Sequence, residues 1–151
     1  AIATGGIRFL DEDIVQGFGV SDREVDAVTY QERLELERRE NYYRQSQPMH
    51  PLTNYHVILV DDGLATGSSM KVAVMAVRRF RPASITIAVP VSEMHICNQL
   101  QAYVNQVVCL QTPAPFISVG RWYADFRPTT DEDVRSLLHQ AHQRFNDTSI
   151  A

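Results

Sequence analysis

The stretch that decides the fold spans residues 57–69 and reads Val57-Ile58-Leu59-Val60-Asp61-Asp62-Gly63-Leu64-Ala65-Thr66-Gly67-Ser68-Ser69. Its first four residues are apolar, which is typical of a strand in the middle of a parallel sheet. Two acids follow, and a loop of small residues then leads into an amphipathic run from Ser68 to Phe80. The stretch therefore predicts a strand, a loop and a helix, with polar groups at the carboxyl end of the strand.

Strands and helices alternate through the rest of this region. We expect strands over His56 to Asp61, Ile85 to Pro90 and Gln106 to Leu110, and helices over Ser68 to Phe80 and Glu93 to Val104. Such alternation predicts an α/β fold, a Rossmann-like parallel sheet with helices on both faces. Three parallel strands are few for a doubly wound sheet, so we expect a domain that is incomplete at its N-terminus.

The N-terminal part of the chain carries its own structural signals. Residues 1–10 read as two short strands around Gly5-Gly6, because glycine supplies the positive φ angles of a tight hairpin. Ser21 and Glu24 match a capping box, which predicts that a charged helix begins there and runs to about Arg44.

Two loops and a last helix complete the predicted outline. Glu35 and Arg39 sit one turn apart, which favours a solvated helix face over a ligand site. We expect loops over residues 45–54 and 113–128, the second rich in aromatic side chains, and a capped helix from Thr130. The predicted inner stripe of this last helix consists of Val134, Leu137, Leu138, Ala141 and Phe145.

Composition limits the class of protein. The chain has 151 residues, a formal charge of −4, 44% hydrophobic and 21% charged residues, which favours one folded domain over residues 1–151. The mild acidity argues against nucleic acid as a partner, and apolar runs such as Val72 to Val77 are too short for a membrane span. Cys97 and Cys109 lack paired spacing, so we expect small core residues without a disulfide, in a reducing cytoplasm.

The acids and the small loop suit a sugar phosphate. Small side chains let the main chain of residues 65–69 approach an anion at a helix N-terminus, and hydroxyls add hydrogen bonds. The carboxylates accept hydrogen bonds and suit two ribose hydroxyls, with Mg²⁺ relieving their repulsion. The predicted substrate-binding residues are Asp61, Asp62, Gly63, Leu64, Ala65, Thr66, Gly67, Ser68 and Ser69.

This stretch resembles the phosphoribosyl diphosphate signature of the type I phosphoribosyltransferases, which has four apolar residues, two acids and a Thr-Gly loop. The segments Glu35 to Glu40, Val89 to Val91 and Pro115 to Phe126 resemble a bacterial subgroup whose acceptor is unassigned. The resemblance implies that the acids hold the ribose hydroxyls and residues 65–69 the 5-phosphate. It implies transfer of a phosphoribosyl group to an unidentified acceptor with release of pyrophosphate, and Mg²⁺ bound mainly with the diphosphate.

The resemblance also implies what this chain lacks. Some purine-salvage members carry an aspartate where this chain has Ala65, so the catalytic residues remain unassigned. The first strand, pyrophosphate loop and hood of the family have no counterpart before Ala1, so we expect transferase activity of the full-length form rather than of these 151 residues. The acceptor contacts would fall on Phe116, Trp122 and Tyr123, which could stack on a planar base; the alternative is that these rings close the end of the sheet.

Other classes of function share parts of this pattern. A non-catalytic ribose-phosphate or nucleotide-binding regulatory module is the alternative, with phosphoribosyl diphosphate or a nucleoside monophosphate as the small-molecule ligand, and a homodimer is left open. Lys71 is the only lysine, which argues against a receiver domain, and Gly67-Ser68-Ser69 lacks the lysine of a nucleotide-hydrolase P-loop. The five histidines do not show metal-ligand spacing, so no metal centre is predicted.

Overall fold

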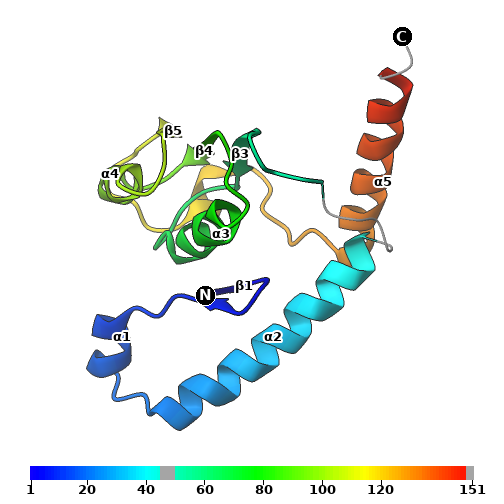
Figure 1. Ribbon diagram of the computed structural model, residues 1–151. Coiled ribbons are helices and arrows are strands. Elements are labelled where there is room, and N and C mark those ends of the chain that lie inside the picture. The colour runs from blue at the N-terminus through cyan, green and yellow to red at the C-terminus, as the bar shows by residue number, and fades with distance from the viewer. Residues whose placement is uncertain (45–49, 149–151) are drawn as a thin grey trace.

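A three-stranded parallel sheet forms the centre of the computed structural model, which describes residues 1–44 and 50–148 and not the side chains of residues 13, 14 and 145–148. The strands β3 (His56–Val60), β4 (Ser84–Val91) and β5 (Gln106–Gln111) lie side by side in chain order. Helix α3 (Ser68–Arg78) joins β3 to β4, and α4 (Met94–Gln101) joins β4 to β5 (Figure 1). The α/β fold with a parallel sheet and flanking helices is confirmed.

The hydrophobic core lies on one face of this sheet. Alternate residues of β4 point into it, as expected for a strand with a period of two. Its buried members come from the loop after β3, from both crossover helices and from β4: Leu64, Met70, Val74, Ile85, Ile87, Val89, Ile96 and Leu100. Both helices therefore pack on the same face.

The opposite face of the sheet is open among the described residues. Ile58, Val60 and Leu110 point away from the core and are between 63% and 74% exposed. The expectation of helices on both faces is wrong for this part of the chain. Since the strand order never reverses, each right-handed crossover places its helix on the same side.

The N-terminal hairpin packs on the outer side of α3. Its strands β1 (Ile2–Ala3) and β2 (Ile7–Arg8) are antiparallel, and both glycines of the turn have positive φ, +82° and +72°. The Arg79 Nη1 atom donates a hydrogen bond of 3.0 Å to the Gly5 carbonyl. Ile7 of the hairpin and Val72 of α3 are buried, so α3 has neighbours on two sides. The predicted hairpin is confirmed, with shorter strands.

A short helix α1 (Glu12–Gly17) precedes the long helix α2 (Asp22–Arg44). The Ser21 N–H donates to Glu24 Oε2 at 2.9 Å and the Glu24 N–H donates to Ser21 Oγ at 3.4 Å, which confirms the capping box. No residue of α2 is buried. Residues 45–49 of the loop predicted after α2 lie outside the described residues.

Helix α5 (Asp131–Thr148) follows the single turn η1 (Val119–Trp122) and extends away from the sheet (Figure 1). Leu137 and Leu138 are 59% and 50% exposed, so the predicted inner stripe is wrong at these positions, and the Phe145 side chain lies outside the described ones. The stripe stays exposed because α5 contacts α2 near its own beginning and then projects outward. None of the described helices combines the length and apolar character needed to traverse a bilayer.

A disulfide joins α4 to β5. The Cys97 and Cys109 sulfurs are bonded, with the Cα atoms 6.7 Å apart. The expectation of two unpaired cysteines is wrong, because the short connection after α4 returns the chain to β5 directly beside that helix. The sequence spacing of 12 residues carries no recognised motif, so only this packing reveals the pair.

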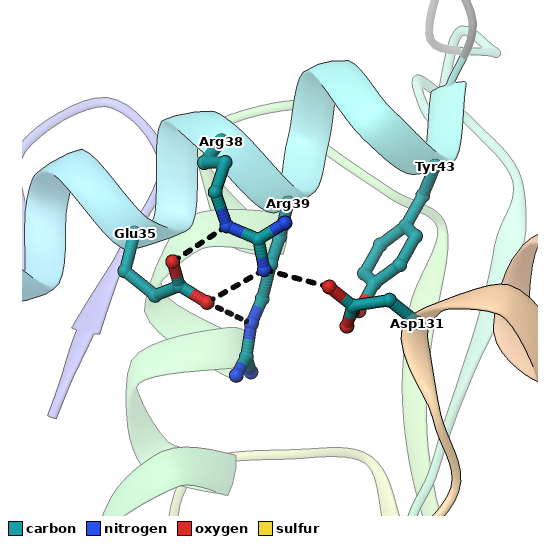
Figure 2. Close-up of polar contacts among 5 residues, drawn as sticks. All are labelled: Glu35, Arg38, Arg39, Tyr43 and Asp131. Carbon is teal, nitrogen blue, oxygen red and sulfur yellow. Dashed lines mark hydrogen bonds and ion pairs between the residues drawn. The ribbon is translucent and has the colours of Figure 1, made fainter.

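A polar cluster holds α5 against α2 (Figure 2). Arg38 donates from Nε to Glu35 Oε2 and from Nη2 to Asp131 Oδ2, both at 2.7 Å. Arg39 Nε donates to the other oxygen of Glu35, Oε1, also at 2.7 Å. The Tyr43 hydroxyl donates to the second oxygen of Asp131 at 2.6 Å. The hydrogen bonds from Arg38 and Arg39 lower the pKa of Glu35 to about 2. The predicted pair between Glu35 and Arg39 is confirmed, and the cluster also joins two helices that are distant in the sequence.

Candidate functional site

Two exposed acids stand at the carboxyl end of β3. Asp61 and Asp62 follow the last strand residue directly, and the Asp62 N–H donates to Asp61 Oδ1 at 3.0 Å. Partial burial raises the pKa of the Asp62 carboxyl and the charge of Asp61 adds to this, while a hydrogen bond from the Gly63 N–H opposes it. The acid pair can therefore bind hydroxyl donors or a cation.

The loop after the acids ends in a backbone conformation that suits glycine. Gly67 has φ of +72° and precedes the first residue of α3. A Cβ at this position would lie 3.1 Å from Ile96 Cγ2, so α4 lies directly behind the loop. The Thr66 hydroxyl accepts a hydrogen bond from the Ser68 N–H at 3.4 Å and donates one to Ser68 Oγ at 3.1 Å.

The backbone N–H groups at the beginning of α3 have no acceptor within the helix, and that of Ser68 bonds to the Thr66 hydroxyl. The Lys71 N–H donates to the Gly67 carbonyl at 2.9 Å, as the first full turn of the helix requires. The N–H groups before it lack intrahelical acceptors by the geometry of any α-helix. Ala65, Thr66 and Ser69 are exposed, so this end of the helix faces the surface of the molecule. It can therefore receive an anion.

Leu64 anchors the loop to the neighbouring strand. Its side chain is buried in the core, its N–H donates to the Val91 carbonyl at 3.1 Å, and its own carbonyl accepts a bond from Ser92 Oγ at 3.2 Å. Of the predicted substrate-binding residues, Gly63, Leu64 and Gly67 are buried and Ser68 is half-buried, while the acid pair and residues 65, 66 and 69 are exposed. Sequence reasoning missed Ser92, whose signal is a polar residue directly after an apolar strand.

The aromatic segment, residues 113–128, closes on the acid pair. The Tyr123 hydroxyl donates to the Asp62 carbonyl at 2.6 Å. A Cβ on Gly63 would lie 2.6 Å from Val119 Cγ1 and 2.8 Å from the Val91 carbonyl oxygen. Glycine at position 63 therefore permits this close approach, which no local sequence signal predicts.

The three aromatic residues proposed to contact an acceptor occupy different surroundings. Tyr123 is half-buried and bonded to the acid pair. Phe116 is half-buried on the same segment, and Trp122 is 49% exposed. The indole of Trp122 is therefore the ring that is most accessible to a ligand.

The described residues contain no group of three or more His, Cys, Asp or Glu side chains that could hold a metal ion. Mg²⁺ in proteins is often held by one or two carboxylates together with the phosphates of a substrate. The acid pair fits that type of binding.

A known protein family matches the part of the chain that carries this geometry. The family described as phosphoribosyl transferase domain matches residues 1–122, which include the sheet, both crossover helices and the acid pair. The chain belongs to the phosphoribosyltransferase family. The resemblance carried by residues 57–69 is thereby confirmed at the level of the family.

Named relatives agree with this membership. The chain is 37% identical over 145 residues to two Mycobacterium tuberculosis proteins, "Putative phosphoribosyl transferase MT0597" and "Putative phosphoribosyl transferase Rv0571c". The match covers 96% of this chain and 33% of each relative, so the chain spans about a third of their length. The crystal structure of TT1426 from Thermus thermophilus is similar with a TM-score of 0.69 and 34% identity, over 85% of this chain and 61% of that one.

Proposed function

We propose that the acid pair and the loop after it bind the ribose 5-phosphate part of 5-phosphoribosyl 1-diphosphate. The observation that carries this proposal is the position of two exposed carboxylates immediately before a loop whose residues 65 and 66 are exposed and which ends in the left-handed Gly67 at the beginning of α3. Ionised carboxylates accept hydrogen bonds only, so Asp61 and Asp62 suit the two hydroxyl donors of a ribose.

The loop would hold the 5-phosphate. The amides of residues 65–69 and the helix dipole favour a negative charge at the beginning of α3. The hydroxyls of Ser68, which accepts the bond from Thr66, and of Ser69 add neutral donors at the same end. Both contacts leave the anomeric carbon of the sugar free to react, with pyrophosphate as the leaving group.

The acceptor and the metal complete the proposed reaction. Trp122 offers an exposed ring for a planar acceptor base, with Phe116 and Tyr123 on the same segment. Mg²⁺ would arrive with the diphosphate and neutralise its charge during departure. Positioning and electrostatics then supply the rate, and the full-length form would transfer the phosphoribosyl group to a small molecule.

The alternative is a module that binds ribose phosphates or nucleotides without transferring the sugar. Ala65 favours it, because its methyl group cannot take a proton from an acceptor base. The two functions share the ribose-phosphate site and differ in the release of pyrophosphate.

Calorimetric titration with ribose 5-phosphate and with 5-phosphoribosyl 1-diphosphate plus Mg²⁺ tests the proposed site. Asp61→Asn together with Asp62→Asn should weaken both ligands by at least tenfold, because charge-assisted hydrogen bonds contribute about 1.5–3 kcal/mol each. The matched control, Asp22→Asn with Glu32→Gln, removes two charges from exposed positions of α2 and should bind as the wild type does. Equal affinity of the acid-pair variant and the control would refute the assigned role.

Pyrophosphate release separates the enzyme from the binding module. A panel of purine, pyrimidine and other planar bases would be offered with 5-phosphoribosyl 1-diphosphate and Mg²⁺. Release by the full-length form that depends on one base supports transfer, whereas tight binding without release by that form across the panel supports the module.

A further inference from the structure

Tyr123 makes a contact that joins two distant parts of the site. Its hydroxyl donates a 2.6 Å hydrogen bond to the main-chain carbonyl of Asp62, 61 residues earlier in the sequence. Because the bond goes to the main chain, it leaves the Asp62 carboxylate, which also accepts the Gly63 N–H, with lone pairs for another partner. The contact therefore holds the residue without occupying its functional group.

The aromatic segment is folded so that this hydroxyl is held in place. The rings of Tyr123 and Phe126 pack with centroids 5.2 Å apart, and the Tyr123 N–H donates to the Gly120 carbonyl at 3.3 Å. A Cβ on Gly120 would lie 2.7 Å from Phe126 Cδ1, so the chain bends tightly around that ring. Tyr123 thus reaches Asp62 from a turn that is held by contacts of its own with Phe126 and Gly120.

The next residue is held by the same segment. Gly63 is buried, with Val119 directly over its Cα, and Leu64 is tied to β4 through the Val91 carbonyl and Ser92. The backbone is therefore held in place at three consecutive residues, 62, 63 and 64. The 65–69 part of the loop is supported instead by α4, which lies behind Gly67.

We propose that Tyr123 is a positioning residue, whose hydroxyl fixes the main chain of Asp62 so that the acid pair is aligned for two ribose hydroxyls. The inference rests on the proposed function and deepens it. It separates the site into a pentose half, aligned by the aromatic segment, and a phosphate half, supported by α4.

Tyr123→Phe tests the proposal because it removes one oxygen atom and keeps the ring contact with Phe126. Calorimetry would compare ribose 5-phosphate with inorganic phosphate, each bound to the variant and to the wild type. We expect affinity for ribose 5-phosphate to fall by between about two- and tenfold, the range for one lost hydrogen bond, and affinity for inorganic phosphate to stay unchanged. Tyr30→Phe, on the exposed face of α2, is the matched control.

Three results would overturn the proposal in distinguishable ways. If the wild type binds ribose 5-phosphate and Tyr123→Phe binds it equally well, the positioning role fails and the proposed function stands. If the variant loses both ligands alike, Tyr123 supports the fold in general. If the wild type binds neither ligand, the proposed function fails.

Amide hydrogen exchange gives a readout that needs no ligand. We expect Tyr123→Phe to speed exchange at Leu64, whose N–H is bonded to Val91 beside the released turn, and to leave Lys71 unchanged. Unchanged exchange at Leu64 would show that the hydroxyl does not hold the acid pair.

Discussion

Gly63→Ala should destabilise the fold through a clash that the structure locates. The new Cβ would lie 2.6 Å and 2.9 Å from the two Cγ atoms of Val119, and 2.8 Å from the Val91 carbonyl oxygen. Overpacking of this kind costs about 1–3 kcal/mol. The same carbonyl accepts the Leu64 N–H at 3.1 Å, and loss of that bond adds about 1 kcal/mol.

The expected loss is therefore about 2–4 kcal/mol in the free energy of unfolding. For a chain of this size each kcal/mol lowers Tm by about 2–4 °C. Urea denaturation followed by circular dichroism would measure the loss directly. Gly17→Ala is the matched control, because a Cβ there meets nothing within 4 Å and its φ is not positive.

A second substitution tests whether the clash with Val119 causes this loss of stability. Val119→Ala removes both Cγ atoms and leaves the contact with the Val91 oxygen, so Gly63→Ala should cost about half as much in that background. If the two substitutions are additive, or if Gly63→Ala costs no more than Gly17→Ala, the close approach of the aromatic segment to Gly63 is wrong.

Reduction of the Cys97–Cys109 disulfide by a dithiol should lower the free energy of unfolding by about 2–3 kcal/mol, the value that loop entropy gives for a closed loop of this length. Urea denaturation curves with and without reductant measure this loss. A Cys97→Ser variant as stable as the oxidised wild type would contradict the prediction. Asp131→Asn should loosen α5, seen as faster amide exchange in that helix with no change in α3. Acid should do the same, because the hydrogen bond from Tyr43, followed by that from Arg38, lowers the pKa of Asp131. The stabilisation is present above the ordinary aspartate pKa and is lost as the pH falls through the lowered value. Protection factors in α5, corrected for the intrinsic pH dependence of amide exchange, that stay constant as the pH falls below the ordinary aspartate pKa would contradict the contact.

Local signals in the sequence were sufficient for most elements. The Ser21 and Glu24 capping box, the apolar run before Asp61 and the glycine before Ser68 each act between residues that are close in the chain. Helix caps and strand alternation depend on neighbours up to four residues away. For this reason the parallel sheet, the beginning of α3 and the position of the acid pair could be predicted before any contact was known.

The contacts between distant elements could not be predicted in this way. The disulfide, the Asp131 cluster and the bond from Tyr123 to Asp62 join residues 12 to 93 positions apart. The open sheet face and the exposed stripe of α5 depend equally on which elements pack together. The hydrophobic pattern of a segment indicates that one face is apolar, but whether another element covers that face depends on the packing of the whole chain.

The sequence by itself thus determined the elements of this chain and the carboxylate chemistry at the end of β3, because both depend on residue types at short spacing. Only the tertiary structure decided which groups support that chemistry: Ser92 and Val91 at Leu64, Val119 at Gly63, and Tyr123 at Asp62. The physical reason is that such contacts require surfaces from separate elements to meet at hydrogen-bond and van der Waals distance, and no short stretch of sequence specifies that meeting.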